Sequence, residues 1–188
     1  MRLFFIPLLT IPFLHGCIAM EGVHNVIVNS KHKYIEPSTG EIANLRAFFD
    51  DSGSISIYPN ASTFIEAKSD KNAGSLSTDR KITGLNSVDY ERKSIGMPFP
   101  PTNDTTYAEY KVPAGKPFVV SLSFKTVQSY GSNNVYFTCK RRFFKVSLES
   151  NKNYGVRPTI MNKRCSYQFF EYEDNGRETP VKSFQMLR

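Results

Sequence analysis

Histidine and cysteine are scarce in this chain, whose 188 residues contain three of each. A nucleophilic serine or cysteine site needs a histidine or an equivalent base. Only His24 and His32 lie outside the apolar N-terminal run, and no further ligand accompanies them as a zinc site requires. We therefore expect no catalytic residue, no metal and no cofactor, and predict that the protein is not an enzyme.

Motifs of hydrolase and nucleotide chemistry are also absent. The chain has no G-x-S-x-G sequence and no glycine loop that would cradle a phosphate. Grouped carboxylates, which glycoside cleavage requires, occur at Asp89 and Glu91, and at Glu171, Glu173 and Asp174. Their polar surroundings favour solvated charges, so an envelope hydrolase is the weakest of three hypotheses, and the other two are given below.

No apolar run is long enough to cross a bilayer as a helix, which takes ~20 residues. The most apolar stretch follows Arg2 and has the length and polarity of a secretory signal. It ends in Leu14-His15-Gly16-Cys17, which resembles the lipobox of bacterial lipoproteins. The resemblance implies that Cys17 is acylated and becomes the mature N-terminus. An ordinary signal cut after Ala19, or a buried N-terminal strand, are the alternatives.

The lipobox resemblance also implies a location. The residue after the cysteine is Ile18 and not an aspartate, which implies the bacterial outer membrane. The domain would be lipid-anchored there and face the periplasm, with the cell surface as the alternative. We expect a signal peptide over 1–16, a leader over 17–33 and one β domain over 34–188.

Two cysteines, Cys139 and Cys165, remain once Cys17 carries lipid. In an oxidising compartment such a pair predicts one disulfide. The net charge of +7 favours acidic partners, such as anionic lipid headgroups or an acidic protein. Nucleic acid is excluded as a partner because export separates the chain from it.

Strand-like alternation recurs along the chain, and no window shows a helical stripe. The clearest case is 118–124, where apolar residues alternate with smaller or polar ones. Aromatic and β-branched residues suit such half-buried strands. The fold class we predict is all-β: an antiparallel β-sandwich or open barrel of about eight short strands with one disulfide.

Several finer expectations follow from the pattern. The runs 42–49 and 54–58 look like a hairpin, 63–67 looks like a short strand, and 181–187 looks like a final strand. The polar segment 68–105 has no sustained period and is expected to be a long insertion. Within it, the prolines predict an extended segment over 96–101.

The second half of the chain resembles a group of uncharacterised proteobacterial lipoproteins. The resemblance lies in Ile95-Gly96-Met97-Pro98, in Tyr107-Ala108-Glu109-Tyr110, and in Val112-Pro113-Ala114-Gly115-Lys116-Pro117 followed by the two cysteines. These motifs are turns and a disulfide, so the resemblance implies an exported β-rich domain and no particular activity.

Basic residues gather between Lys140 and Arg164, a stretch with the single acid Glu149. The disulfide would bring its two ends together. The candidate binding patch comprises Lys140, Arg141, Arg142, Lys145, Arg157, Lys163 and Arg164, and Lys152 lies in the same stretch. Such a patch can dock phosphates or an acidic protein. The alternative is a solvated face whose charges prevent edge pairing between molecules.

Two functions are compatible with these features. The first is an exported, membrane-tethered lipoprotein that acts as a non-enzymatic binding or structural module in the cell envelope. Its cationic face would bind an acidic protein or an anionic envelope lipid or glycan. The second is an inhibitor or immunity-type protein that blocks an exported hydrolase with a protruding loop. The candidate loop comprises Gly96, Met97, Pro98, Phe99 and Pro100.

Overall fold

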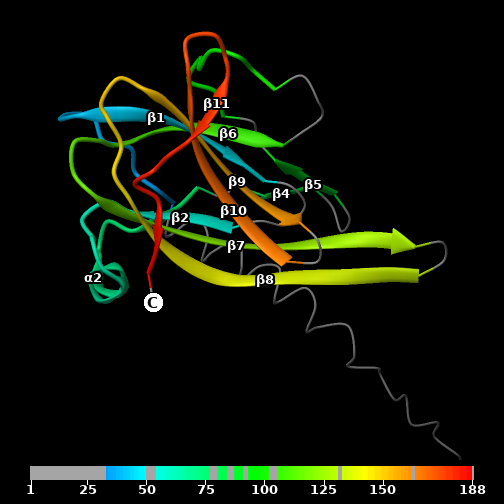
Figure 1. The fold of residues 1–188 in the computed structure, drawn as a ribbon. Coiled ribbons are helices and arrows are strands. Elements are labelled where there is room, and N and C mark those ends of the chain that lie inside the picture. The colour runs from blue at the N-terminus through cyan, green and yellow to red at the C-terminus, as the bar shows by residue number, and fades with distance from the viewer. Residues whose placement is uncertain are drawn as a thin grey trace, which may run out of the picture.

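Two five-stranded sheets make up most of the fold (Figure 1). The computed structural model describes residues 33–49, 54–76, 80–83, 87–90, 93–101, 106–130, 133–161 and 164–187. Cys17, His24, His32 and Lys163, and the expected signal peptide, lie outside the described residues. Within these residues, no helix combines the length and the apolar character needed to cross a membrane.

The first sheet has the strand order β11-β10-β9-β1-β6. Its strands are β1 (Ile42–Phe48), β6 (Tyr107–Pro113), β9 (Asn153–Met161), β10 (Arg164–Tyr172) and β11 (Glu178–Pro180). Neighbouring strands are antiparallel except β1 and β9, which are parallel.

The second sheet has the order β12-β8-β7-β2-β3, and all its pairs are antiparallel. Its strands are β2 (Ser54–Tyr58), β3 (Gly74–Ser75), β7 (Phe118–Tyr130), β8 (Asn133–Val146) and β12 (Gln185–Met186). A separate hairpin pairs β4 (Arg80–Thr83) with β5 (Ser87–Tyr90). The backbones of β7 and β8 continue side by side past the other strands (Figure 1).

The core lies between the two sheets. Leu45 and Ala47 of β1 face Val120 and Leu122 of β7 in one buried cluster, to which Phe169 of β10 also belongs. The alternation that predicted 118–124 as a strand therefore places its apolar side chains in the core. The predicted fold class, an all-β sandwich with one disulfide, is confirmed, although the two sheets contain ten strands and not about eight.

The predicted hairpin of 42–49 with 54–58 is wrong, because β1 and β2 belong to different sheets. β1 lies between β9 and β6, whereas β2 lies between β7 and β3. Two adjacent alternating runs can pair with each other or pair with distant strands, and alternation alone does not distinguish these outcomes. The expected turn at 50–53 lies outside the described residues.

The predicted strand at 63–67 is also wrong, since the helix α2 (Phe64–Ser69) occupies this segment. The side chain of Thr63 accepts a hydrogen bond from the Glu66 backbone N–H, and the Glu66 carboxylate accepts one from the Ser62 backbone N–H. These reciprocal bonds form a capping arrangement at the helix N-terminus. The sequence Thr63-x-x-Glu66 carries this signal, and it outweighs the short apolar run.

Two further boundaries differ from expectation. The segment 181–187 is not one strand, because β12 covers only Gln185–Met186. The preceding strand, β11, ends at Pro180 and belongs to the other sheet. Between them, the Ser183 hydroxyl donates to the Ser147 carbonyl, which holds the chain as it crosses between sheets. The polar insertion 68–105 contains β3 and the β4–β5 hairpin, so it is partly regular.

Candidate functional site

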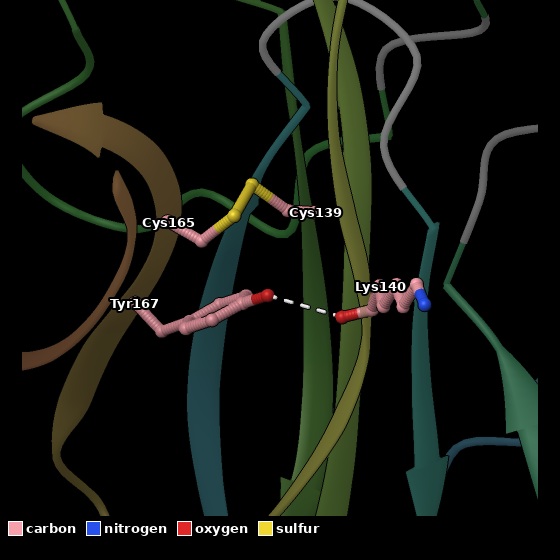
Figure 2. Close-up of a disulfide and its surroundings, with 4 residues drawn as sticks. All are labelled: Cys139, Lys140, Cys165 and Tyr167. Atoms are coloured by element: carbon pink, nitrogen blue, oxygen red, sulfur yellow. Dashed lines mark hydrogen bonds between the residues drawn. A yellow bond between two sulfur atoms is a disulfide. The ribbon is translucent and has the colours of Figure 1, made fainter. Parts of the chain in front are cut away.

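The disulfide between Cys139 and Cys165 joins the two sheets of the sandwich (Figure 2). Cys139 lies on β8 and Cys165 on β10, with their Cα atoms 5.7 Å apart. Next to it, the Tyr167 hydroxyl donates a 3.2 Å hydrogen bond to the Lys140 carbonyl. The predicted disulfide is confirmed, and it fixes the position of β8 relative to β10.

A β-bulge next to Cys139 explains why three consecutive basic residues are exposed. Leu122 of β7 pairs with Arg142, whereas Phe124 pairs with Cys139, so two residues of β8 oppose one residue of β7. An extra residue of this kind interrupts the regular alternation of sides. As a result, Lys140, Arg141 and Arg142 are all exposed, which an unbroken strand does not allow.

The described part of β8 is largely open on its outer edge. β12 pairs with it only at Phe144 and Lys145. We call the exposed basic set Lys140, Arg141, Arg142 and Arg164 the disulfide edge, because each member lies within three residues of a bonded cysteine. None of the four forms an ion pair with another residue that the structure describes. Within the described residues, no carboxylate neutralises these four charges.

Other members of the predicted patch lie elsewhere. The Arg157 guanidinium pairs with Glu178 at 3.1 Å and lies over the rings of Phe48 and Phe170, on the outer face of the first sheet. Lys152, which belongs to the same basic stretch but not to the seven-residue patch, pairs with the carboxylates of Glu149 and Glu171. The seven-residue patch is therefore not one surface.

Lys145 is also separated from the disulfide edge. It is paired in register with Val119, whose side chain belongs to the cluster beneath α2 on the outer face of the second sheet. The pKa of Glu66 in α2 is lowered, first by hydrogen bonds from Ser62 and also by the charge of Lys145. This lysine therefore faces the helix.

A buried ion pair, absent from the sequence-based expectations, lies beneath the candidate loop. Arg46 of β1 and Glu109 of β6 are directly opposite each other in register, 2.8 Å apart and at most 1% exposed. The Arg46 guanidinium also donates to three backbone carbonyls, those of Met97, Pro98 and Phe99, at 3.2, 3.0 and 2.6 Å. We call this pair the buried clamp.

The second oxygen of Glu109 holds the same loop. It accepts hydrogen bonds from the Ser94 hydroxyl at 2.8 Å and from the backbone N–H groups of Ile95 and Met97 at 2.9 and 3.1 Å. Burial alone would raise the pKa of Glu109, but the hydrogen bonds, that from Arg46 foremost, outweigh burial and lower the pKa. The carboxylate is therefore ionised at neutral pH.

The expected extended conformation of 96–101 is wrong. Gly96 and Phe99 have φ values of 81° and 55°, so the segment bends and turns its carbonyls toward Arg46. Met97 is buried against the first sheet, and the Phe99 ring lies against Gly176 while remaining 43% exposed. The loop is therefore folded onto the sheet, with the side chains of Pro98, Phe99 and Pro100 exposed.

The buried clamp is hidden in the sequence because Arg46 lies on the side of β1 that alternation directs away from the core. Leu45 and Ala47 flank Arg46 and belong to the core cluster. The loop then covers the other side of the sheet, so both sides of β1 are buried. Opposite charges within two apolar runs are the only signal in the sequence, and they do not reveal that the strands pair.

Two of the five candidate catalytic carboxylates, Glu171 and Glu173, are engaged in ion pairs, and the side chains of Asp89 and Glu91 lie outside the described part of the chain. Glu171 pairs with Lys152 at 2.9 Å, and Glu173 pairs with Arg177 at 2.7 Å. The hydrogen bonds from Arg177 and Thr179 lower the pKa of Glu173, so it is a poor general acid at neutral pH. Among the described residues, no three His, Cys, Asp or Glu side chains gather as a metal site requires.

Comparison with protein-family models, with curated proteins and with solved structures finds no match to this chain. The resemblance to proteobacterial lipoproteins stays a prediction. The geometry of the disulfide edge and of the loop over the buried clamp is therefore the basis for a function.

Proposed function

We propose that this protein is an exported, membrane-tethered binding module of the bacterial cell envelope, and that its disulfide edge binds an acidic protein. The module acts without catalysis. Cys17 would carry the lipid, and two or more acyl chains would make the anchoring stable. The outer membrane, with the domain facing the periplasm, is the proposed location.

The observation that carries this proposal is the geometry of the disulfide edge. Four exposed cations without an acidic partner in the described chain lie on two strands that a covalent bond connects. The disulfide fixes the backbone that carries these charges, so binding has to order the side chains and not the strands. Arginine, which supplies three of the four cations, forms bidentate bonds with carboxylates.

The test is affinity capture from crosslinked cells with a charge-reversed variant, Arg141→Glu together with Arg142→Glu. We expect partners captured by the wild type to be lost, because two cations at the centre of the edge become anions. Capture should also weaken as salt is raised, since exposed charges are screened. The captured protein should carry an acidic surface.

The matched control reverses two charges elsewhere, Lys111→Glu together with Lys182→Glu. Both lysines are exposed and lie outside the disulfide edge, so this variant has the same net charge as the first. It should retain every partner. Equal capture by the edge variant and the wild type would remove the disulfide edge from the account.

A second candidate function is inhibition of an exported hydrolase by the loop Gly96, Met97, Pro98, Phe99 and Pro100. The buried clamp favours it, because a loop whose backbone is already fixed binds with a smaller entropy cost. Inhibition of a cell-wall lytic enzyme that is lost in Phe99→Ala and retained in Arg141→Glu, Arg142→Glu would support this candidate. Inhibition that is retained in Phe99→Ala and lost in Arg141→Glu, Arg142→Glu would exclude this candidate.

A further inference from the structure

A cleft of about 740 Å³ opens at the end of the sandwich where the described chain begins. Three connections and the segment after Lys33 surround it: the turn after β2, the turn after α2 and the turn between β6 and β7. Its size is that of a small-molecule site. Prolines in three of its walls, Pro37, Pro59 and Pro113, restrict the backbone around it.

The charged residues that line the cleft are mainly cationic. Lys33, Lys71 and Lys116 contribute three positive charges, and Glu41 contributes one negative charge. The Glu41 carboxylate lies over Gly115, where the chain turns with a φ of 75°. Lys71 and Lys116 are exposed and form no ion pair with a described residue. The cleft therefore favours a ligand with a negative charge.

The cleft lies at the start of β7, whereas the disulfide edge lies beside the middle of this strand. The strand begins at Phe118, two residues after Lys116, and Phe124 is paired with Cys139. Six residues of strand separate these positions by about 20 Å. The cleft is therefore a separate site from the disulfide edge.

The described chain enters the fold at the cleft. Lys33 both lines the cleft and forms the first backbone bridge of the fold, to Ser75. In the proposed function, the lipid anchor precedes this residue by the short leader 17–33. A tether that joins the fold here attaches at the cleft end of the sandwich and keeps the cleft within about 55 Å of the membrane, the reach of the extended leader.

We propose that the cleft binds the phosphate of an anionic phospholipid headgroup, in the membrane that holds the tether. This inference rests on the proposed function, because the tether brings the headgroups to the cleft. Binding there orients the domain with the cleft on the membrane and the disulfide edge directed away from it. Glycerol phosphate carries the same charged group in soluble form.

The test uses the full acylated chain in lipid nanodiscs. The chain contains no tryptophan, so Asn72→Trp adds a single fluorophore at the cleft wall and Thr138→Trp adds one near the disulfide edge. The discs contain phosphatidylcholine alone or with phosphatidylglycerol, and a nitroxide on the headgroups quenches nearby fluorophores. We expect quenching at position 72 only in the discs with phosphatidylglycerol, and none at position 138.

Two variants identify the cleft lysines as the cause. Lys71→Gln with Lys116→Gln should abolish the quenching at position 72, since each lysine near an anionic surface contributes about five-fold to the binding constant. Arg141→Gln with Arg142→Gln, in the disulfide edge, should leave the quenching unchanged. Soluble glycerol 1-phosphate should compete with it.

Three results would overturn the inference. They are equal quenching in both kinds of disc, quenching that survives loss of Lys71 and Lys116, and quenching that glycerol 1-phosphate does not reduce. Failure of the proposed tether has a different signature, because an unacylated chain would not stay in phosphatidylcholine discs. In that case, direct titration with glycerol 1-phosphate, with the lysine variant as control, still tests the cleft.

Discussion

At the scale of single residues, the buried clamp is an arrangement that is costly to disturb. Arg46 and Glu109 are almost completely buried, and between them they hold the backbone from Ser94 to Phe99. Removing one member of a buried ion pair leaves the other charge without compensation. The loop also loses the hydrogen bonds that shape it.

Glu109→Gln tests the buried clamp with little change of volume. We expect the free energy of unfolding to fall by about 3–5 kcal/mol, because Arg46 then has no buried anion opposite it. Urea denaturation at neutral pH measures the change. Lys152→Gln is the control, since its ion pairs are exposed and should contribute little. Equal stability of Glu109→Gln and the wild type would show that the clamp contributes nothing.

The stability of the protein should fall at acid pH. The pKa of Glu109 is lower in the folded protein than the value of about 4.3 expected in the unfolded chain. Its contribution is therefore complete above the unfolded-state pKa and is lost as the pH falls through the folded-state pKa. The free energy of unfolding, measured by urea denaturation at a series of pH values from about 7 to 3, should show this loss. The loss should be smaller in Glu109→Gln. An equal dependence of the free energy of unfolding on pH in the two proteins would show that Glu109 does not cause the loss.

Residue-level features were the hardest to predict from the sequence. Cys139 and Cys165 were identified as a pair because counting cysteines is enough when few are present. Arg46 and Glu109 were not identified, because only the pairing of β1 with β6 brings them together. The bulge that exposes Lys140 to Arg142 likewise depends on the register of β7 with β8.

At the scale of elements, the disulfide determines how the two sheets are held at one end. It connects β8 to β10 across a sequence separation of 26 residues. Replacing both cysteines with alanine should lower the free energy of unfolding by roughly 3–4 kcal/mol. Denaturation of the oxidised and the reduced wild type provides the matched comparison. Unchanged stability after reduction would contradict the role assigned to this bond.

Strands were predicted better than their partners. Alternation located β1, β2 and the first part of β7 correctly, since it depends only on which side of a strand is buried. It did not show that β1 and β2 belong to different sheets. The helix α2 was missed because its short apolar run resembles a strand, while the capping residues Thr63 and Glu66 favour a helix.

At the scale of the whole molecule, basic residues occur at both ends of the sandwich. The cleft with Lys71 and Lys116 lies at the end where the described chain begins, and the disulfide edge lies about 20 Å further along β7. The net charge of +7 indicated acidic partners but not their number or place. We propose that one end faces lipid and the other faces protein.

The mass of the mature N-terminal peptide, from protein isolated from the membrane fraction, tests the central claim most directly. The account predicts a peptide that begins at Cys17 and carries acyl groups, in a chain whose other two cysteines are oxidised. An unacylated chain that retains Met1, with Cys139 and Cys165 reduced, would contradict export, tether and proposed partners together.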